Sequence, residues 1–375
     1  MPARARNATH GRSVSGASSK EEDSKEPQPM MLLASLIALP LLSASPAPAG
    51  ALDRTQVDAQ AKWIAHFDVE AFRGTQLLVE AKAADKEGEL EKGLAKIAAE
   101  HGIQVLDDVF SITAYGTVLG EDHGVAIVRA NARAEAALAK AAEQAGAKPE
   151  RVGERDFVRW GGDKDAAFSC LRPATGERRE IVFAKSQADL AQALDVLEKK
   201  RPGLDSQPQS DLFAAPAAGT FAFVAASGIL EELASPAGHD VQQLSAMARL
   251  AKGVRIELGE NGGNLFVDLR LRTEKPEDAK RVQRIFDGLL ALPGLLHADS
   301  EASDVVDRLT QAISVEAQNE SAHLRFQYGT HALFGEIQTL QSLGLGQGGL
   351  EPLRALHSGG GHGHKPAEKP EEKPK

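Results

Sequence analysis

The feature that most constrains the fold is a repeated pattern of two strands, a turn and a helix. The clearest copy lies at residues 254–292, where VRIEL and LFVDLRLR alternate apolar and polar residues around the turn GENGGN. Alternation with a period of two is typical of a strand with one buried face, and an Asn-Gly pair permits the positive φ of a tight turn. The segment predicts a β-hairpin, then a helix that begins at Pro276 and ends at Pro293-Gly294.

Three other segments follow the same pattern, at residues 111–146, 165–200 and 312–343. Gly146 is placed to end the helix of the first segment, and Ser186 is placed to cap the helix of the second. A strand followed by a helix precedes each pair of copies, in AKWIAHFDVEAF and in GTFAFVAASGILEEL. The order β-α, ββα, ββα therefore occurs twice.

Equivalent positions of the two series are separated by similar lengths of chain. Ile112 precedes Val254 by 142 residues, and Phe183 precedes Phe326 by 143 residues. Trp63 precedes Phe223 by 160 residues, and the extra length corresponds to the polar stretch at residues 81–92. This regularity predicts an internal duplication.

The predicted halves are residues 52–205 and 206–356, and a segment rich in Pro, Ser and Gly at residues 201–219 joins them. We expect an α+β fold in which each half forms an antiparallel sheet with helices on one face, with ferredoxin-like character. Exposed edge strands promote aggregation, which favours two sheets joined edge to edge over two that pack separately.

Residues 30–42, MMLLASLIALPLL, form an apolar run that is too short to span a bilayer and typical of a signal peptide. Small residues follow, and Ala49-Gly50-Ala51 fits an A-x-A cleavage site. We expect export to the periplasm or the extracellular space, with cleavage near Ala49–Ala51; the other interpretation is a short buried helix. Residues 1–29 are polar and predicted to be disordered. Their charges suit a leader poorly, so translation from Met30 or Met31 is an alternative start.

Charge and cysteine content exclude several classes of partner. The formal net charge is -10, and the first 51 residues contribute five Lys/Arg against four Asp/Glu, so the remainder is near -11. An acidic chain argues against binding to nucleic acid or anionic lipid. The single cysteine, Cys170, excludes a disulfide framework and is expected to be a buried, inert thiol. No stretch after the leader is apolar enough to predict a transmembrane segment.

His66 and Asp68 form one candidate site, because residues two apart lie on the same side of a strand. Such a pair can contribute to a metal site, which needs at least one further ligand. The alternative is structural: Asp68 precedes VEAF and is well placed to cap a helix. In the duplication Asp68 aligns with Ser227, another capping residue type, whereas His66 aligns with Ala225.

The C-terminal tail offers a second metal candidate. Residues 357–375 place His357, His362 and His364 among glycines and then continue into a Lys/Pro/Glu run. Neighbouring imidazoles can capture a transition-metal ion, but a flexible polar tail does not preorganise them. We therefore expect a disordered tail.

Two further motifs have structural interpretations. GLGQGG at residues 344–349 matches G-x-G-x-x-G, yet it follows a helix and no βαβ unit surrounds it, so a helix end in a loop is expected. Arg270 and Arg272 could recognise an anionic partner, but alternation predicts that they belong, with Asp268, to a solvated sheet face. No other catalytic motif is recognisable, and no cofactor is expected.

The stretches AKWIAHFDVEAF, VLDDVFSITAYG and NLFVDLRLRTEKPEDAKRV carry a resemblance that covers roughly residues 55–345. They resemble exported bacterial proteins of unknown function that open with an A-K-W-x-x-H-x-D strand after a signal peptide. The matching positions look like core and capping residues, so the resemblance implies no activity and no catalytic residue.

The sequence favours an exported, non-enzymatic α+β scaffold or binding protein, whose partner is a protein, a polymer or a small ligand. A regular repeat of core positions without converging polar residues motivates this hypothesis. The alternative is a hydrolase or metal-dependent enzyme with a site between the halves, near His66 and Asp68.

Overall fold

The computed structural model describes residues 50–118, 123–152, 154–162, 165–173, 178–206, 211–228, 249–296 and 301–343. Several sequence predictions fall outside these ranges: the leader, the helix after Ser227, the motif at residues 344–349 and the histidine-containing tail. None of the helices within the described ranges combines the length and the apolar character that crossing a membrane requires.

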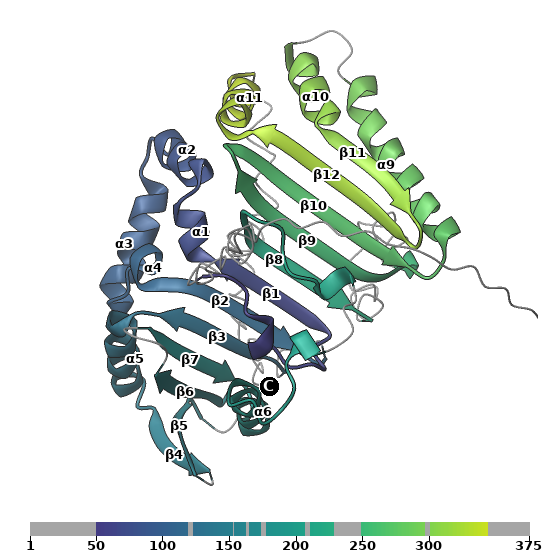
Figure 1. Ribbon diagram of the computed structural model, residues 1–375. Coiled ribbons are helices and arrows are strands. Elements are labelled where there is room, and N and C mark those ends of the chain that lie inside the picture. Colours follow the sequence, from purple (N-terminus) through teal and green to yellow (C-terminus); the bar gives the residue numbers. More distant parts are fainter. Residues whose placement is uncertain are drawn as a thin grey trace, which may run out of the picture. The chain divides into compact units, whose positions relative to one another are not determined.

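The described strands form one sheet of 12 strands in the order β11-β12-β10-β9-β8-β1-β2-β3-β7-β6-β5-β4 (Figure 1). The first seven in the chain are β1 Trp63–Asp68, β2 Val109–Gly116, β3 Val125–Ala130, β4 Lys148–Val152, β5 Arg155–Trp160, β6 Ala167–Pro173 and β7 Arg179–Ala184. The others are β8 Thr220–Ser227, β9 Ala251–Asn261, β10 Asn264–Thr273, β11 Ile313–Gln318 and β12 Ser321–Gly329. All neighbouring strands are antiparallel.

The two predicted halves meet in the middle of this sheet. β1 pairs with β8, with His66 opposite Phe223 and Ile64 opposite Ala225. From this junction the strands run outward as β1-β2-β3-β7-β6 on one side and as β8-β9-β10-β12-β11 on the other. The expectation that the sheets join edge to edge is therefore confirmed.

Helices occur between the strands and at the ends of the sheet. Those before β8 are α1 Val69–Arg73, α2 Gln76–Ala84, α3 Glu89–His101, α4 Val105–Asp108, α5 Ala132–Gln144 and α6 Gln187–Leu197. Those after it are α9 Pro276–Leu296, α10 Glu301–Gln311 and α11 Thr330–Ser342. Short 3-10 helices lie at η1 Arg54–Gln56, η2 Leu204–Ser206 and η3 Asp211–Phe213.

Local sequence explains where several of these helices begin and end. The side chain of Ser186 accepts a hydrogen bond from the Asp189 amide at 3.0 Å and caps α6, as expected. Asn131 caps α5 in the same way. Gly146, with φ of 61°, follows the end of α5, in a backbone region that glycine occupies without a steric penalty.

The main core lies on one face of the sheet, called here the His66 face because it carries Ile64, His66 and Asp68 of β1. Leu190 and Leu194 of α6 pack in this core and are almost fully buried. Their partners from the strands include Ile64, Tyr115, Val125, Ile127, Val182 and Phe223. Alternation in β1, β2, β3 and β7 thus supplies one apolar layer, and α6 covers it.

In the second half, a helix covers the opposite face. Val282 of α9 is fully buried in a cluster with Leu271 of β10 and Val254 of β9. Val254 is next in sequence to Arg255, which lies on the His66 face opposite Ala225. Neighbouring strand residues point to opposite faces, so α9 and α6 pack on different sides. The helices therefore do not form a single layer over the joined sheet.

Four elements differ from the sequence predictions. The chain between β1 and β2 forms α1 to α4 rather than a single helix, and the polar stretch at residues 81–92 ends α2 and begins α3. The hairpin β4–β5 and the helix α10 have no counterpart in the predicted order. α9 also continues past Pro293 to Leu296, since a proline near a helix end removes only one backbone hydrogen bond.

Candidate functional site

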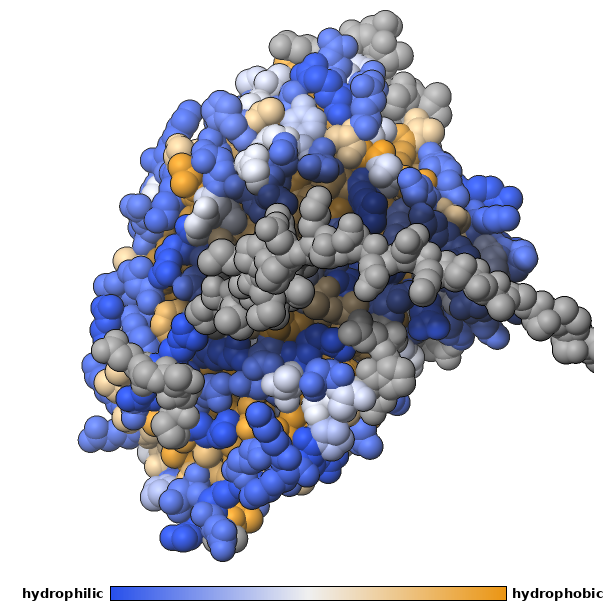
Figure 2. Space-filling model, in the orientation of Figure 1, coloured by the Kyte–Doolittle hydropathy of each residue, from blue (hydrophilic) through white to orange (hydrophobic). Residues whose placement is uncertain are grey.

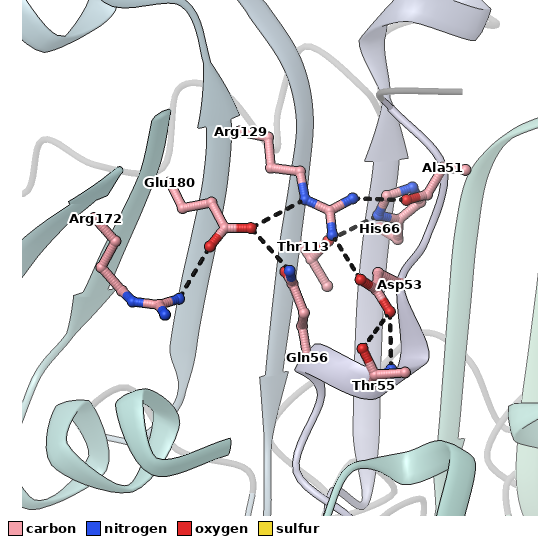
Figure 3. A network of polar contacts seen from close by, with 9 residues as sticks. All are labelled: Ala51, Asp53, Thr55, Gln56, His66, Thr113, Arg129, Arg172 and Glu180. Atoms are coloured by element: carbon pink, nitrogen blue, oxygen red, sulfur yellow. Dashed lines mark hydrogen bonds and ion pairs between the residues drawn. The ribbon is translucent and has the colours of Figure 1, made fainter. Parts of the chain in front are cut away.

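The first candidate site is the pair His66 and Asp68. The segment that precedes β1 crosses the His66 face at this pair. The carbonyl of Ala51 accepts a hydrogen bond from Nη1 of Arg129 at 2.9 Å. Nη2 of the same guanidinium lies 3.3 Å from the carboxylate of Asp53 (Figure 3). Arg129 therefore fixes this segment on the sheet.

A row of charges continues from Arg129 along neighbouring strands. Arg129, Glu180 and Arg172 lie opposite one another on β3, β7 and β6. Glu180 accepts a hydrogen bond from Arg172 at 3.0 Å and one from Gln56 at 2.8 Å, and it lies 3.7 Å from Nε of Arg129 (Figure 3). Every charge in the row has a partner. We therefore assign the row a structural role, in which it holds residues 51–56 on the sheet.

His66 is buried between this row and the apolar core. Its Nδ1 lies 2.8 Å from the hydroxyl of Thr113, whereas its Nε2 has no hydrogen-bond partner among the described residues. Burial, followed by the positive charge of Arg129, lowers the pKa of His66 to about 4, although a backbone group of Gly50 opposes the shift. The imidazole is therefore neutral near pH 7.

Asp68 performs the predicted capping role. Its Oδ1 accepts a hydrogen bond from the Ala71 amide at 2.8 Å, at the start of α1. Burial raises the pKa of Asp68, and this hydrogen bond works in the opposite direction. The carboxylate is thus directed toward the helix end, as a cap requires.

A metal centre at this pair would need at least one more ligand. Among the residues that the structure describes, no group of three or more His, Cys, Asp or Glu side chains is arranged to hold a metal ion. His66 and Asp68 lie on the same face, as predicted, but only these two of the proposed ligands come together. His357, His362 and His364 lie outside the described ranges.

A second site lies between α1, α2, α3 and α4, where the structure has a cavity of about 530 Å³. Its wall is largely apolar, formed by Leu78, Val79, Leu94, Ala95, Ala98, Val105 and Leu106. Val79 is 56% exposed although it is a large apolar residue. A volume of this size is within the usual range for sites that bind small organic molecules.

Few polar groups face this cavity. Arg73, Lys82, Gln104 and Asp107 contribute to its lining. Arg73 donates to the carbonyl of Leu106 at 2.9 Å and lies 3.9 Å from the carboxylate of Asp107. Within the described part of the chain, Lys82 has no ion-pair partner. The cavity therefore carries one positive charge that no neighbouring carboxylate balances.

α3 is the least buried wall of the cavity. It has no buried residue along its 13 positions, and Leu90 and Ile97 are 37% and 39% exposed. A second hollow of about 480 Å³ lies along α3 and shares Leu94 with the first. Figure 2 shows apolar side chains at the surface over the α2–α3 region. Since an isolated helix of this length is marginal in water, contacts on its apolar stripe determine its stability.

α2, by contrast, is anchored to the second half of the sheet. The carboxylate of Glu260 accepts hydrogen bonds from the Gln76 and Leu77 amides at 2.7 and 2.8 Å, at the start of α2. Glu80 lies 2.8 Å from Nδ1 of His331 on α11, and this bond is the first cause of its lowered pKa. One wall of the cavity is therefore fixed, while the α3 wall has few contacts.

Sequence reasoning missed this cavity because residues 81–92 were interpreted as a polar insertion. Leu90, Leu94 and Ile97 recur at the spacing of a helical face and could have revealed an amphipathic helix. The remaining candidates have structural roles. Cys170 is half-buried, and burial raises the pKa of its thiol, which disfavours the reactive thiolate.

The Arg270/Arg272 stripe is only partly solvated. Arg272 is exposed as expected, whereas Arg270 is half-buried. Asp268 on the same face is also half-buried and pairs with Arg325 of β12 at 2.9 Å.

No protein-family model matches the chain, and no curated protein matches its sequence. Among solved structures, crystal form III of TP0453 aligns with a TM-score of 0.39 and 11% identity, over 77% of this chain and 99% of that one. Crystal form I of TP0453 aligns with a TM-score of 0.37 and 9% identity, over 77% and 98% of the two chains. Scores in this range do not establish a common fold.

Proposed function

We propose that the chain is an exported, non-enzymatic binding protein that takes a small, largely apolar ligand into the cavity formed by α1, α2, α3 and α4. The observation that carries this proposal is the cavity itself, with its apolar lining and its solvent-exposed Val79. Burial of apolar area contributes roughly 25 cal/mol per Å², so a ligand that covers these side chains gains affinity without any catalytic group.

The three charged residues of the lining, Arg73, Lys82 and Asp107, suggest which charge the ligand carries. Arg73 and Asp107 largely satisfy each other, whereas Lys82 has no ion-pair partner among the described residues. A ligand with an apolar body and at most one anionic group would match this balance. Lysine can keep its ammonium group in water while its stem lies along apolar surface, so the charge belongs at the mouth of the cavity.

The proposal includes an internal duplication in which each half has ferredoxin-like character. The mirrored strand orders about the β1–β8 junction support it, because unrelated segments have no reason to share one order. Export remains part of the proposal on the strength of the apolar run at residues 30–42, as does the resemblance to exported proteins of unknown function.

The enzymatic alternative has less support. A hydrolase or metal-dependent enzyme would use His66 and Asp68, but Asp68 caps α1 and Nδ1 of His66 contacts Thr113. A general base has to reach the substrate proton, directly or through one water, and His66 is only 6% exposed.

The proposal is tested by binding of the uncharged apolar fluorophore Nile red, measured by fluorescence titration of the full chain. We expect saturable binding that is weakened at least tenfold by Ala98→Phe, because the added ring would occupy the cavity. Ala99→Phe is the matched control, since Ala99 is on the same helix and does not line the cavity. Equal binding by the two variants would show that the dye binds elsewhere, and would exclude the cavity as the binding site.

A further inference from the structure

Gly50, the first residue that the structure describes, is buried against the start of α1. Its backbone nitrogen donates a hydrogen bond to Oε2 of Glu70 at 3.1 Å. A Cβ at this position would overlap Oδ1 of Asp68 and approach the carbonyl of Phe110 to 2.8 Å. The backbone of residue 50 is thus fitted closely into a site formed by α1 and β2, and only glycine fits it.

The site around this nitrogen carries more negative than positive charge. Glu70 and Asp68 are two residues apart, and the proximity of Glu70 is one cause of the raised pKa of Asp68, after burial. In the described part of the chain, no lysine or arginine lies within ion-pair distance of Glu70. The imidazole of His66 lies in the same surroundings, because a backbone group of Gly50 is near enough to raise its pKa.

We propose that the mature chain begins at Gly50 and that its new α-ammonium group forms an ion pair with Glu70 in this site. The scissile bond follows Ala47-Pro48-Ala49, which matches the A-x-A pattern two residues before the match at residues 49–51. Hydrolysis by a signal peptidase consumes one water. Ala49 leaves with a carboxylate, and Gly50 gains a protonated amine with three donors in place of one amide N–H.

The position of the cut follows from what each alternative would remove. Cleavage after Ala51 would delete Gly50 and the carbonyl that Arg129 binds at 2.9 Å. Cleavage after Ala49 keeps both contacts and adds a positive charge beside Glu70. An ammonium group next to a carboxylate is stabilised in its charged form. The pKa of this α-ammonium group should therefore be higher than that of an ordinary N-terminus.

The first experiment determines the N-terminus of the full-length chain after expression in a bacterial host, by intact mass and N-terminal sequencing of the exported protein. The expected first residue is Gly50. A mature chain that begins at Leu52, or an exported chain that retains residue 49, would overturn the proposal.

The second experiment measures the pKa of the α-amino group by NMR titration of a chain that begins at Gly50, after ¹³C reductive methylation. We expect a value about one unit above the ordinary 7.7–8.0, which returns to that range in Glu70→Gln. Glu91→Gln, an exposed residue of α3, is the matched control and should leave the pKa unchanged. An ordinary pKa in the unsubstituted chain would contradict the ion pair.

The third experiment measures the melting temperature. It tests whether Glu70 stabilises the protein through an ion pair with the new α-ammonium group or only through its other contacts. The chain that begins at Gly50 should melt about 2 °C higher than the chain that retains Ala49. Glu70→Gln should abolish this difference. A difference that persists in Glu70→Gln would show that another group holds the amine.

Discussion

The two halves of the sheet share one strand order but place their apolar clusters on opposite faces. In the first half the His66 face carries Tyr115, Val125 and Ile127, and α6 packs on it. In the second half the same face carries Arg255 and Glu257, and α9 packs on the other side. The comparison shows that strand order and layer placement are separate properties: alternation of residue types in each strand selects the face that a helix can cover.

The charged face of the second half is covered by the linker instead of by a helix. Arg255 pairs with Glu257 at 2.7 Å and donates to the carbonyls of Asp211, Leu212, Ala214 and Ala215. Glu257 in turn accepts from the Ala217 amide and the Thr220 hydroxyl. The described end of the linker, residues 211–217, is thus held along β9 by two buried charges.

The largest expected effect in this comparison comes from Arg255→Met. The substitution leaves Glu257 buried without its cation, which typically costs about 3–5 kcal/mol of folding free energy. The measurement is urea unfolding at pH 7. Arg325→Met, on the same face but 61% exposed, is the control and should cost less than about 1 kcal/mol. Similar losses in both variants would show that the linker is not held by the buried pair.

A somewhat smaller effect is expected from Leu194→Ala in α6. Leu194 is 1% exposed in the first-half core, so its truncation should cost about 2–5 kcal/mol. Ile112→Ala removes a side chain that is 39% exposed on the opposite face of the same half, and it should cost clearly less. If the two variants were equally destabilised in urea unfolding, the first half would not be packed mainly on its His66 face.

The smallest of the three effects is a pH dependence of the free energy of unfolding. It comes from His66, which can be protonated, whereas its apolar neighbours in the core cannot. The pKa of His66 falls from 6.5 to about 4 on folding, so its contribution to stability is complete above pH 6.5. As the pH falls from 6.5 toward 4, the unfolded state binds the proton first, and up to about 3 kcal/mol is lost.

His66→Gln removes this titration, and the amide can still hydrogen-bond to Thr113. Urea unfolding at pH 7.5, 5.5 and 4.5 should therefore give a flatter pH dependence for the variant than for the unsubstituted chain. His101→Gln, which replaces an exposed histidine at the end of α3, is the control and should retain the original slope. Identical slopes in all three chains would exclude His66 as the titrating group.

Local signals predicted much of the fold correctly. The hairpin β9–β10, the caps at Ser186 and Asp68 and the glycine after α5 each depend on residues close in sequence. The hairpin β4–β5 was not predicted, because its first strand contains Pro149 and proline is depleted in strands. β4 is an edge strand, where a proline without an N–H is tolerated.

The candidate site was less predictable than the fold. The sequence placed His66 and Asp68 on one face and assigned Asp68 its capping role, but it gave no sign that Gly50 would occupy the adjoining space. The cavity walls come from α1, α2, α3 and α4, and its size depends on how these helices pack together. Packing of this kind is set by contacts between residues that no local pattern relates.

By itself, the sequence predicted most of the strands, the tight turn of β9–β10 and several helix caps, because each depends on periodicity and on neighbouring residues. Only the tertiary structure decided that the halves join through β1 and β8, that α6 and α9 lie on opposite faces, and that residues 50–56 lie over His66. These features depend on which distant surfaces bury apolar area and pair charges, and that choice is made by the folded chain as a whole.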